Sequence, residues 1–232
     1  MTTTEDSTPE VDVATATVAV LGGTGDQGRG LARRLALAGN TVVLGSRSAE
    51  RAQKAAAELV EAESIRVDVR GLDNTAAAAE GDIVVVAVPW DGHRELLEGL
   101  VEPLAGKIVV DCVNPLGFDK RGPFPLEVPE GSAAQQAEQV LTDSRVTAAF
   151  HHVSARLLLD PEVAEVDLDV LVMGEDRAAT DVVRALADRI PGVRGVFGGR
   201  LRNAHQVEAL TANLIAVNRR YKTHAGIRIT GL

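Results

Sequence analysis

Short apolar runs alternate with stretches of helical periodicity along most of the chain. The first run, residues 17–21, is continuous and ends in glycine, which is typical of a strand buried on both faces of a parallel sheet. After it, Leu31, Leu35 and Ala38 fall on one helical face, and Gly39 and Asn40 end that helix. The repeated alternation predicts a Rossmann-type, doubly wound α/β fold with a parallel sheet.

The same pattern predicts the other elements. Strands are expected at residues 41–45, 65–69, 82–88, 107–113, 146–150 and 169–173. Helices are expected at residues 49–61, 74–80, 91–100, 132–141, 177–190 and 203–223. Residues 118–130 contain several prolines and are expected to form a loop.

Changes in this pattern divide the chain into three expected parts. Residues 1–16 are rich in Thr, Glu and Asp and lack an apolar period, which favours a disordered tail. Residues 17–155 are expected to form the nucleotide-binding Rossmann domain. Residues 156–232, where the alternation changes, are expected to form a smaller C-terminal α/β domain.

Composition restricts the classes of partner. The 232 residues carry a net charge of −9 and only 3% aromatic residues, which argues against nucleic acids and anionic membranes as partners. No apolar run approaches the roughly 20 residues of a membrane-spanning helix, and no secretory signal pattern is expected at the start. The lone Cys112 excludes an intrachain disulfide, so we expect a cytoplasmic protein.

A glycine-rich loop directly after the first strand is the first chemical signal. The loop contains the G-x-G-x-x-G pattern and comprises Gly23, Thr24, Gly25, Asp26, Gln27 and Gly28. Glycines at these spacings allow a tight turn, close approach to a pyrophosphate and close packing of the next helix, whose N-terminus favours anions. The pattern predicts dinucleotide binding; the alternative is a structural turn that binds nothing.

The end of the second strand carries the second signal. NAD-selective sites usually have Asp or Glu there, bonded to the adenosine ribose. This chain has Ser46 and Arg47 instead, with Arg51 one helical turn later. Guanidinium groups bind a 2′-phosphate through charge-assisted hydrogen bonds, whereas a carboxylate repels it. We therefore expect NADP; a solvated helix start is the alternative role for both arginines.

With these signals, the sequence resembles a known family. Residues 18–51, VAVLGGTGDQGRGLARRLALAGNTVVLGSRSAER, are similar to the opening of the F420-dependent NADP reductases. The similarity continues at Val88-Pro89-Trp90, Val113-Asn114-Pro115, Phe150-His151 and Asn203 to Thr211. The resemblance implies hydride transfer between NADP and the deazaflavin coenzyme F420, with direction left open. It implies no catalytic side chain, because hydride passes directly between stacked rings.

The resemblance also implies roles for particular residues. Residues 24–27 would hold the pyrophosphate, and Ser46, Arg47 and Arg51 the 2′-phosphate. Trp90 and Ala155 would lie along the nicotinamide half, and Pro115 and His151 would face the deazaflavin cleft, closed by the C-terminal domain. The other expected cofactor-binding positions are Asn114, Asn203 and Thr211.

Three departures from the family pattern concern the expected cleft, one of which is Ser154 in place of a familiar proline. The family's Pro-Trp-Glu-His stretch is here Pro89-Trp90-Asp91-Gly92-His93, which displaces a histidine by one position. Asn114 stands where the family has an apolar residue. His151 and His152 are expected to point to opposite faces of a strand, so no metal site is expected.

Charge and apolar patterning near the C-terminus add two further expectations. Basic residues dominate residues 198–232, which suggests an anionic ligand such as the phosphate and glutamate tail of F420; Arg200 and Arg202 would contact it. A solvated or intersubunit surface is the alternative. The helix expected at residues 203–223 carries an apolar stripe, which is expected to pack in the core or in a subunit interface. The second possibility favours a homo-oligomer such as a dimer. The stripe comprises Val207, Leu210, Leu214 and Val217.

Two other functions remain open at this point. One is an NADPH-dependent reductase with a different acceptor, such as a flavin, ferric ion or small carbonyl compound. Carbonyl reduction usually needs a Lys, His or Tyr acid, and no lysine stands near the expected cleft. The other is a non-enzymatic NADP-sensing module that would bind the nucleotide without turnover.

Overall fold

The computed structural model describes residues 11–63 and 65–232. Its strands are β1 (Thr17–Leu21), β2 (Thr41–Ser46), β3 (Val69–Asp73), β4 (Ile83–Val86), β5 (Ile108–Asp111), β6 (Leu116–Asp119), β7 (Gly122–Pro125), β8 (Arg145–Ala148), β9 (Leu168–Gly174) and β10 (Val193–Gly199). Its helices are α1 (Asp26–Leu37), α2 (Ala49–Glu63), α3 (Asn74–Glu80), α4 (His93–Glu98), α5 (Val101–Leu104), α6 (Ala133–Val140), α7 (Ala155–Leu159), α8 (Arg177–Asp188) and α9 (Ala204–Tyr221), with a short 3₁₀ turn at Leu201–Asn203.

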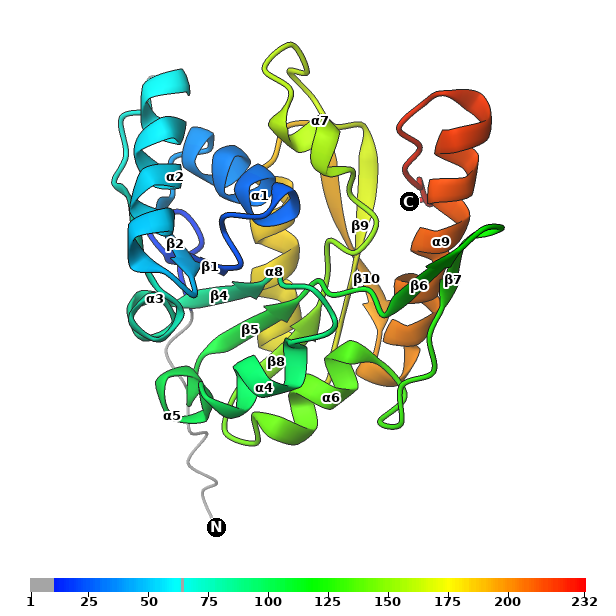
Figure 1. Cartoon of the computed structure of the whole chain (residues 1–232), viewed down its shortest axis with the longest axis horizontal. Helices are drawn as coiled ribbons and strands as arrows, with labels where there is room; N and C mark the ends of the chain where they lie inside the picture. The colour runs from blue at the N-terminus through cyan, green and yellow to red at the C-terminus, as the bar shows by residue number, and fades with distance from the viewer. Residues whose placement is uncertain (1–10, 64) are drawn as a thin grey trace.

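One sheet runs through the molecule in the order β10-β9-β8-β5-β4-β1-β2-β3, with helices on both faces (Figure 1). Alternate residues of each central strand enter two different buried clusters. Val18 and Val20 pack with α1, α2 and α8, whereas Ala19 and Leu21 pack with α3 to α6 and the start of α9. A strand buried on both faces needs apolar side chains at every position, which explains the continuous apolar runs. The arrangement confirms the predicted doubly wound α/β fold.

The direction of the chain reverses once within this sheet. Six strands, β3, β2, β1, β4, β5 and β8 in sheet order, are parallel neighbours. Strand β9 instead pairs antiparallel with β8, through Thr147–Gly174 and Ala148–Met173. The carboxyl ends of β1, β4, β5 and β8 therefore lie at one edge of the sheet, together with the amino end of β9. Ligands of open α/β sheets bind at this carboxyl edge.

The C-terminal region differs from the sequence-based expectation in one respect. The expected smaller α/β domain has no separate sheet among the described residues, because β9 uses the free edge of β8 and β10 then pairs with β9. Backbone pairing at that edge joins both regions into one continuous sheet. The third strand is also displaced: β3 begins at Val69, where the expected strand at 65–69 ended.

The expected tail and loop need correction as well. Residues 1–10 lie outside the described residues, but residues 11–16 form an ordered turn: Asn40 Nδ2 donates to the carbonyl oxygens of Val13 (2.8 Å) and Ala16 (3.2 Å). Within the expected loop at 118–130, β6 and β7 form an antiparallel hairpin that packs against α9. Prolines are compatible with β7 because it is an edge strand.

Substitution of Gly71 in β3 tests how closely the sheet packs against helix α2. A Cβ at Gly71 would lie 2.0 Å from the carbonyl carbon of Ala52 in α2, so backbone would have to move. We expect Gly71→Ala to lower the free energy of unfolding by about 2–3 kcal/mol, measured by urea denaturation. Gly99→Ala, whose Cβ would meet nothing nearer than 3.5 Å, is the control and should stay within about 0.5 kcal/mol. Equal losses in both variants would contradict this packing.

Candidate functional site

The glycine-rich loop forms a tight backbone cradle between β1 and α1. Gly22 has a φ of +79°, and a Cβ there would lie 2.4 Å from the Ala87 carbonyl oxygen. A Cβ at Gly28 would lie 2.5 Å from the Gly22 carbonyl oxygen, so α1 can start this close only with glycine. Gly25 is the N-cap of α1 and provides no side-chain cap. The N–H groups of the first turn of α1 are thus suited to an anion.

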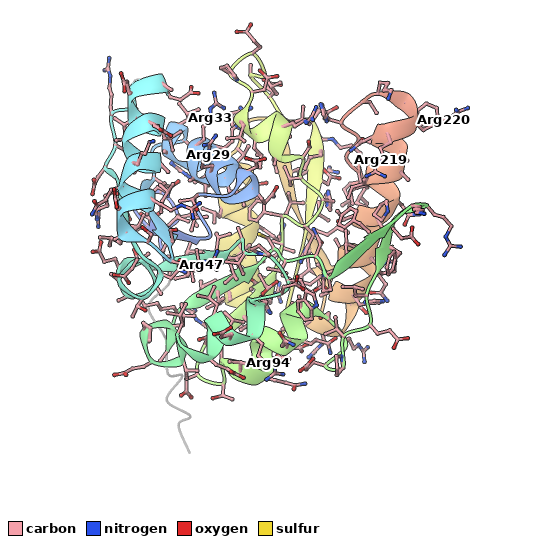
Figure 2. The ribbon with its side chains drawn as sticks, viewed as in Figure 1. Arg29, Arg33, Arg47, Arg94, Arg219 and Arg220 are labelled. Carbon is pink, nitrogen blue, oxygen red and sulfur yellow. The ribbon has the colours of Figure 1, made fainter. Side chains whose placement is uncertain are left out.

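The second strand ends beside two exposed arginines. Ser46 is almost buried at the end of β2, whereas Arg47 and Arg51 are exposed at the start of α2. Neither arginine has an ion pair among the described residues. Figure 2 shows Arg47 on the part of the molecule built by α1 and α2, at a distance from Arg219 and Arg220 on α9.

A cavity of about 990 Å³ opens at the carboxyl edge of the sheet. Its walls come from the segments that follow β4, β5 and β8, from the second half of α9, and from the chain immediately after α9. Six residues expected at the cofactor site line it: Gln27, Trp90, Asn114, His151, Ala155 and Thr211. The structure therefore brings together residues from opposite ends of the chain.

A strained turn forms one wall of this cavity. Phe150 is buried and has a φ of 63°, a left-handed conformation that bulky residues rarely adopt. Side chains from three elements hold the turn by its carbonyl oxygens. Gln27 Nε2 donates to the Phe150 oxygen at 3.3 Å, whereas Asn114 Nδ2 and Thr211 Oγ1 donate to the His151 oxygen at 2.8 and 3.2 Å. These contacts fix the backbone of the turn relative to the glycine loop.

The two histidines after this turn are buried and uncharged. Both ring nitrogens of His151 and of His152 lack a hydrogen-bond partner among the described residues, although both rings line the cavity. Burial lowers the pKa of each imidazole to about 4. Unpaired buried nitrogens at a cavity wall fit a polar ligand that supplies the missing partners.

Beneath Trp90 lies a buried polar network that sequence reasoning missed. The His93 ring stacks on Trp90 with centroids 5.6 Å apart. His93 Nε2 lies 2.6 Å from Asp111 Oδ2, and Nδ1 lies 2.9 Å from Gln136 Oε1. Burial alone lowers the pKa of His93, but Asp111 and the hydrogen bonds outweigh it and raise the pKa above its ordinary value. The displaced histidine of the Pro89-Trp90 stretch was the available signal.

Glu208 extends this network to α9. Its two carboxylate oxygens accept hydrogen bonds from the Ala133 and Ala134 N–H groups, at 3.1 and 3.3 Å, at the start of α6. Burial and the neighbouring Asp111 raise the pKa of Glu208 to about 7. Glu208 therefore joins α9 to α6 one helical turn before Thr211, which contacts the His151 backbone.

Some expected residues do not line the cavity. Pro115 is buried beside Asn114, and Asn203 precedes α9 at its far end. Arg200 pairs with Glu175 on the surface and does not line the cavity, so its expected anion-binding role stays a prediction. Arg228 pairs with Asp167 and Asp169. Arg202 is exposed and lies outside the cavity lining. Arg219 and Lys222 line the cavity instead, so the expectation that no lysine stands near the cleft is wrong.

The chain after α9 is fixed by one buried carboxylate. Asp169 lies at the amino end of β9 and pairs with Arg194 and Arg228. Its Oδ2 accepts from Ile229 N at 2.6 Å, and its own N–H donates to the Ile227 oxygen at 2.8 Å. Hydrogen bonds from Arg194 hold the pKa of Asp169 well below its usual range. The residues between α9 and this anchor are thereby held against the cavity.

Comparison with known proteins matches this geometry to one family. A family profile described as "NADP oxidoreductase coenzyme F420-dependent" matches residues 17–115. The F420-dependent NADP reductase of Methanocaldococcus jannaschii is 43% identical over 224 residues, which cover 93% of this chain and 98% of the relative. The enzyme of the same name from Methanothermobacter marburgensis is 42% identical, with the same two shares covered. This chain belongs to the F420-dependent NADP reductase family.

A solved structure agrees with the family assignment. A protein from Arthrobacter sp. FB24, assigned to the F420-dependent NADP reductases, superposes on this family member with a TM-score of 0.79 at 27% identity. The match covers 93% of this chain and 99% of the other. Within the described residues of this reductase family member, no helix is both long and apolar enough to cross a membrane. No three His, Cys, Asp or Glu side chains in that part of the chain are grouped to hold a metal ion.

The neutral histidines predict a pH dependence of stability. The folded-state pKa of His152 is about 4, below its ordinary value of 6.5, so the unfolded chain binds more protons between these values. The free energy of unfolding should therefore fall as pH drops through this window, by up to about 3 kcal/mol for this group. Urea denaturation of the wild type and His152→Gln between pH 7 and pH 4 measures the difference.

The free energy of unfolding of His152→Gln should change less with pH than that of the wild type. Replacement of His205, which is exposed on α9, by Gln is the control and should leave the slope unchanged. Parallel pH profiles for the wild type and His152→Gln would contradict the buried, neutral state of His152.

Proposed function

We propose that this protein transfers a hydride between NADP(H) and coenzyme F420. The observation that carries the proposal is the cavity at the carboxyl edge of the sheet, which reaches from Gln27 of the glycine loop to the end of α9. Its volume of about 990 Å³ lies at the upper end of ordinary ligand pockets, roughly 300–1,000 Å³, and exceeds the need of one nicotinamide ring. Family membership supports the choice of coenzymes.

In this proposal the glycine cradle and the start of α2 hold NADP(H). The N–H groups at the start of α1 bind the pyrophosphate, with Thr24, Asp26 and Gln27 beside it. Ser46, Arg47 and Arg51 bind the 2′-phosphate, because both guanidinium groups are exposed and have no carboxylate partner in the described structure.

Residues around the cavity position the reacting rings. Trp90 and Ala155 line the nicotinamide half of the cavity, and His151 faces the deazaflavin. The Phe150 turn keeps His151 in place through Gln27, Asn114 and Thr211. With both coenzymes bound, the reduced nicotinamide would supply a hydride and solvent a proton to reduce the deazaflavin, and the reverse reaction would release that proton. The chain's own contribution is orientation and exclusion of water, which neutral His151 and His152 support by adding no charge to the cavity. No side chain is needed as acid or base.

We also propose a cytoplasmic homodimer. The location rests on the lone, buried Cys112, whose thiol pKa burial raises above its usual range. The dimer rests on exposed apolar side chains near α9 and the hairpin, namely Phe118, Phe124 and Tyr221. Sedimentation velocity at micromolar concentration tests the second point, and a monomer would overturn it.

The decisive experiment mixes the protein with NADPH and oxidised F420 and follows both absorbances. We expect NADPH oxidation and F420 reduction at equal rates and in a one-to-one ratio. Turnover with a flavin, ferric salt or carbonyl compound but not with F420 would select a reductase with another acceptor. NADPH binding without turnover of any acceptor would select a nucleotide-sensing module.

Arg47 tests the 2′-phosphate assignment. We expect Arg47→Asp to raise the KM for NADP by roughly ten- to a hundredfold and to improve use of NAD, because a charge-assisted hydrogen bond is replaced by repulsion. Steady-state kinetics with both nucleotides provide the measurement. Lys54→Asp on the exposed face of α2 makes the same charge change and should alter neither KM by more than about twofold. Unchanged selectivity of Arg47→Asp would refute the assignment.

A further inference from the structure

A buried ion pair under the cavity wall has no part in the coenzyme contacts proposed above. His93 is the first residue of α4 and Asp111 the last residue of β5, and both side chains are fully buried. A buried ion pair contributes little net stability compared with apolar residues of similar volume. Stability alone therefore does not explain a charge pair at this place, directly beneath Trp90.

The hydrogen bonds of His93 determine the charge of its ring. Gln136 Nε2 donates to Glu130 Oε2 at 3.3 Å, so the amide oxygen is the atom that faces His93 Nδ1, at 2.9 Å. On the other side, Nε2 lies 2.6 Å from Asp111 Oδ2, and Asp111 Oδ1 accepts from the Val113 N–H at 3.0 Å. Both ring nitrogens thus face acceptors, and only the imidazolium carries a proton on each nitrogen.

The charged groups around the ring favour the same state. Burial alone lowers the pKa of His93, but Asp111, the hydrogen bonds and Glu208 of α9 outweigh it and raise the pKa above the ordinary 6.5. Glu130, which precedes α6, is itself paired with Arg94 and adds little unbalanced charge. The ring therefore stays positive at neutral pH and loses its charge only at a higher pH.

This positive ring lies against the indole of Trp90. The two rings are stacked, with centroids 5.6 Å apart and planes inclined by 30°, and the His93 N–H donates to the Trp90 carbonyl oxygen at 3.0 Å. Trp90 is half-buried and lines the cavity. Attraction between a desolvated cation and an indole face amounts to roughly tenfold in an equilibrium constant. The charge on His93 therefore favours one orientation of the indole.

We propose that His93 is a positioning residue, whose imidazolium holds the Trp90 indole in the orientation that forms the nicotinamide wall of the cavity. Asp111 and Gln136 keep the ring charged. His93 is outside the cavity lining, so it acts only through Trp90 and exchanges no proton with a coenzyme. The inference rests on the proposed function and adds to it a requirement for charge beneath one wall.

Asp111→Asn removes this charge while keeping the hydrogen bonds. The asparagine oxygen can still accept from the Val113 N–H, and its amide group can donate to His93 Nε2. The imidazole then keeps a single proton, on Nδ1, and becomes neutral. The variant thus separates the charge of the ring from its presence.

The emission of Trp90 in the free protein reports the charge, because Trp90 is the only tryptophan of the chain. An imidazolium in contact with an indole quenches its emission much more strongly than a neutral imidazole does. We expect wild-type emission to rise with pH, with a midpoint above 6.5. The emission of Asp111→Asn should be bright and independent of pH. His205→Gln, at an exposed histidine of α9, is the control and should reproduce the wild-type titration.

Single-turnover hydride transfer from NADPH to F420 tests the positioning role. We expect the rate of Asp111→Asn to fall about three- to tenfold at neutral pH, because the indole is less firmly oriented. The Kd for NADPH, measured by calorimetry, should stay within about twofold, since the phosphates bind at the glycine cradle and α2. The ratio of wild-type to variant rates should approach one as pH rises through the emission midpoint. This ratio cancels the proton that the reaction itself takes up.

Several results would overturn the proposal. Wild-type emission that does not change with pH would contradict a charged ring in contact with Trp90. Equal single-turnover rates, or a rate loss that is the same at every pH, would contradict positioning by charge. Should Asp111→Asn fail to fold by circular dichroism, the wild-type titration and His93→Gln, which should be bright and independent of pH, carry the test of the charge.

Failure of the proposed function is distinguishable from these results. A wild type that reduces no F420 would overturn hydride transfer between the two coenzymes. The emission titration uses neither coenzyme, so it would still decide whether His93 is charged against Trp90.

Discussion

The position of the Phe150 turn is the constraint on which the cavity depends. A large apolar residue held in a left-handed conformation costs of order 1–3 kcal/mol, and three hydrogen bonds from Gln27, Asn114 and Thr211 oppose its relaxation. These donors come from the start of α1, the segment after β5 and the middle of α9. The turn therefore sets how the glycine loop, the sheet edge and the last helix lie relative to one another.

The buried network under Trp90 supports the same arrangement from below. His93 and Asp111 connect α4 to β5, and Glu208 connects α9 to the start of α6. Buried charges are weak contributors to net stability but strongly favour one arrangement when every polar atom has a partner. Trp90 rests on this network, so the cavity wall is held by polar contacts that are fully sheltered from water.

Most of the fold, but only part of the site, was accessible from the sequence. Continuous apolar runs such as residues 17–21 specify strands buried on both faces, and the glycine loop specifies the turn after β1. The hairpin of β6 and β7 is not predicted from the sequence, because its prolines are typical of loops, although an edge strand also tolerates them. The separate C-terminal domain was expected because periodicity does not reveal that β9 pairs with β8. Likewise, sequence spacing could not show that Arg200 meets Glu175 while Arg219 faces the cavity.

The clamp of Asp169 on Arg194, Arg228 and the Ile227–Ile229 backbone has a consequence for biosynthesis. The segment after α9, anchored at Ile227 and Ile229, lines a chamber whose opposite side includes Gln27 of α1. Domains emerge from the ribosome amino end first. The nascent protein can assemble its glycine cradle early, yet the chamber stays incomplete until the segment up to Ile229 has emerged, so a product that lacks α9 and this segment would retain one wall without the other.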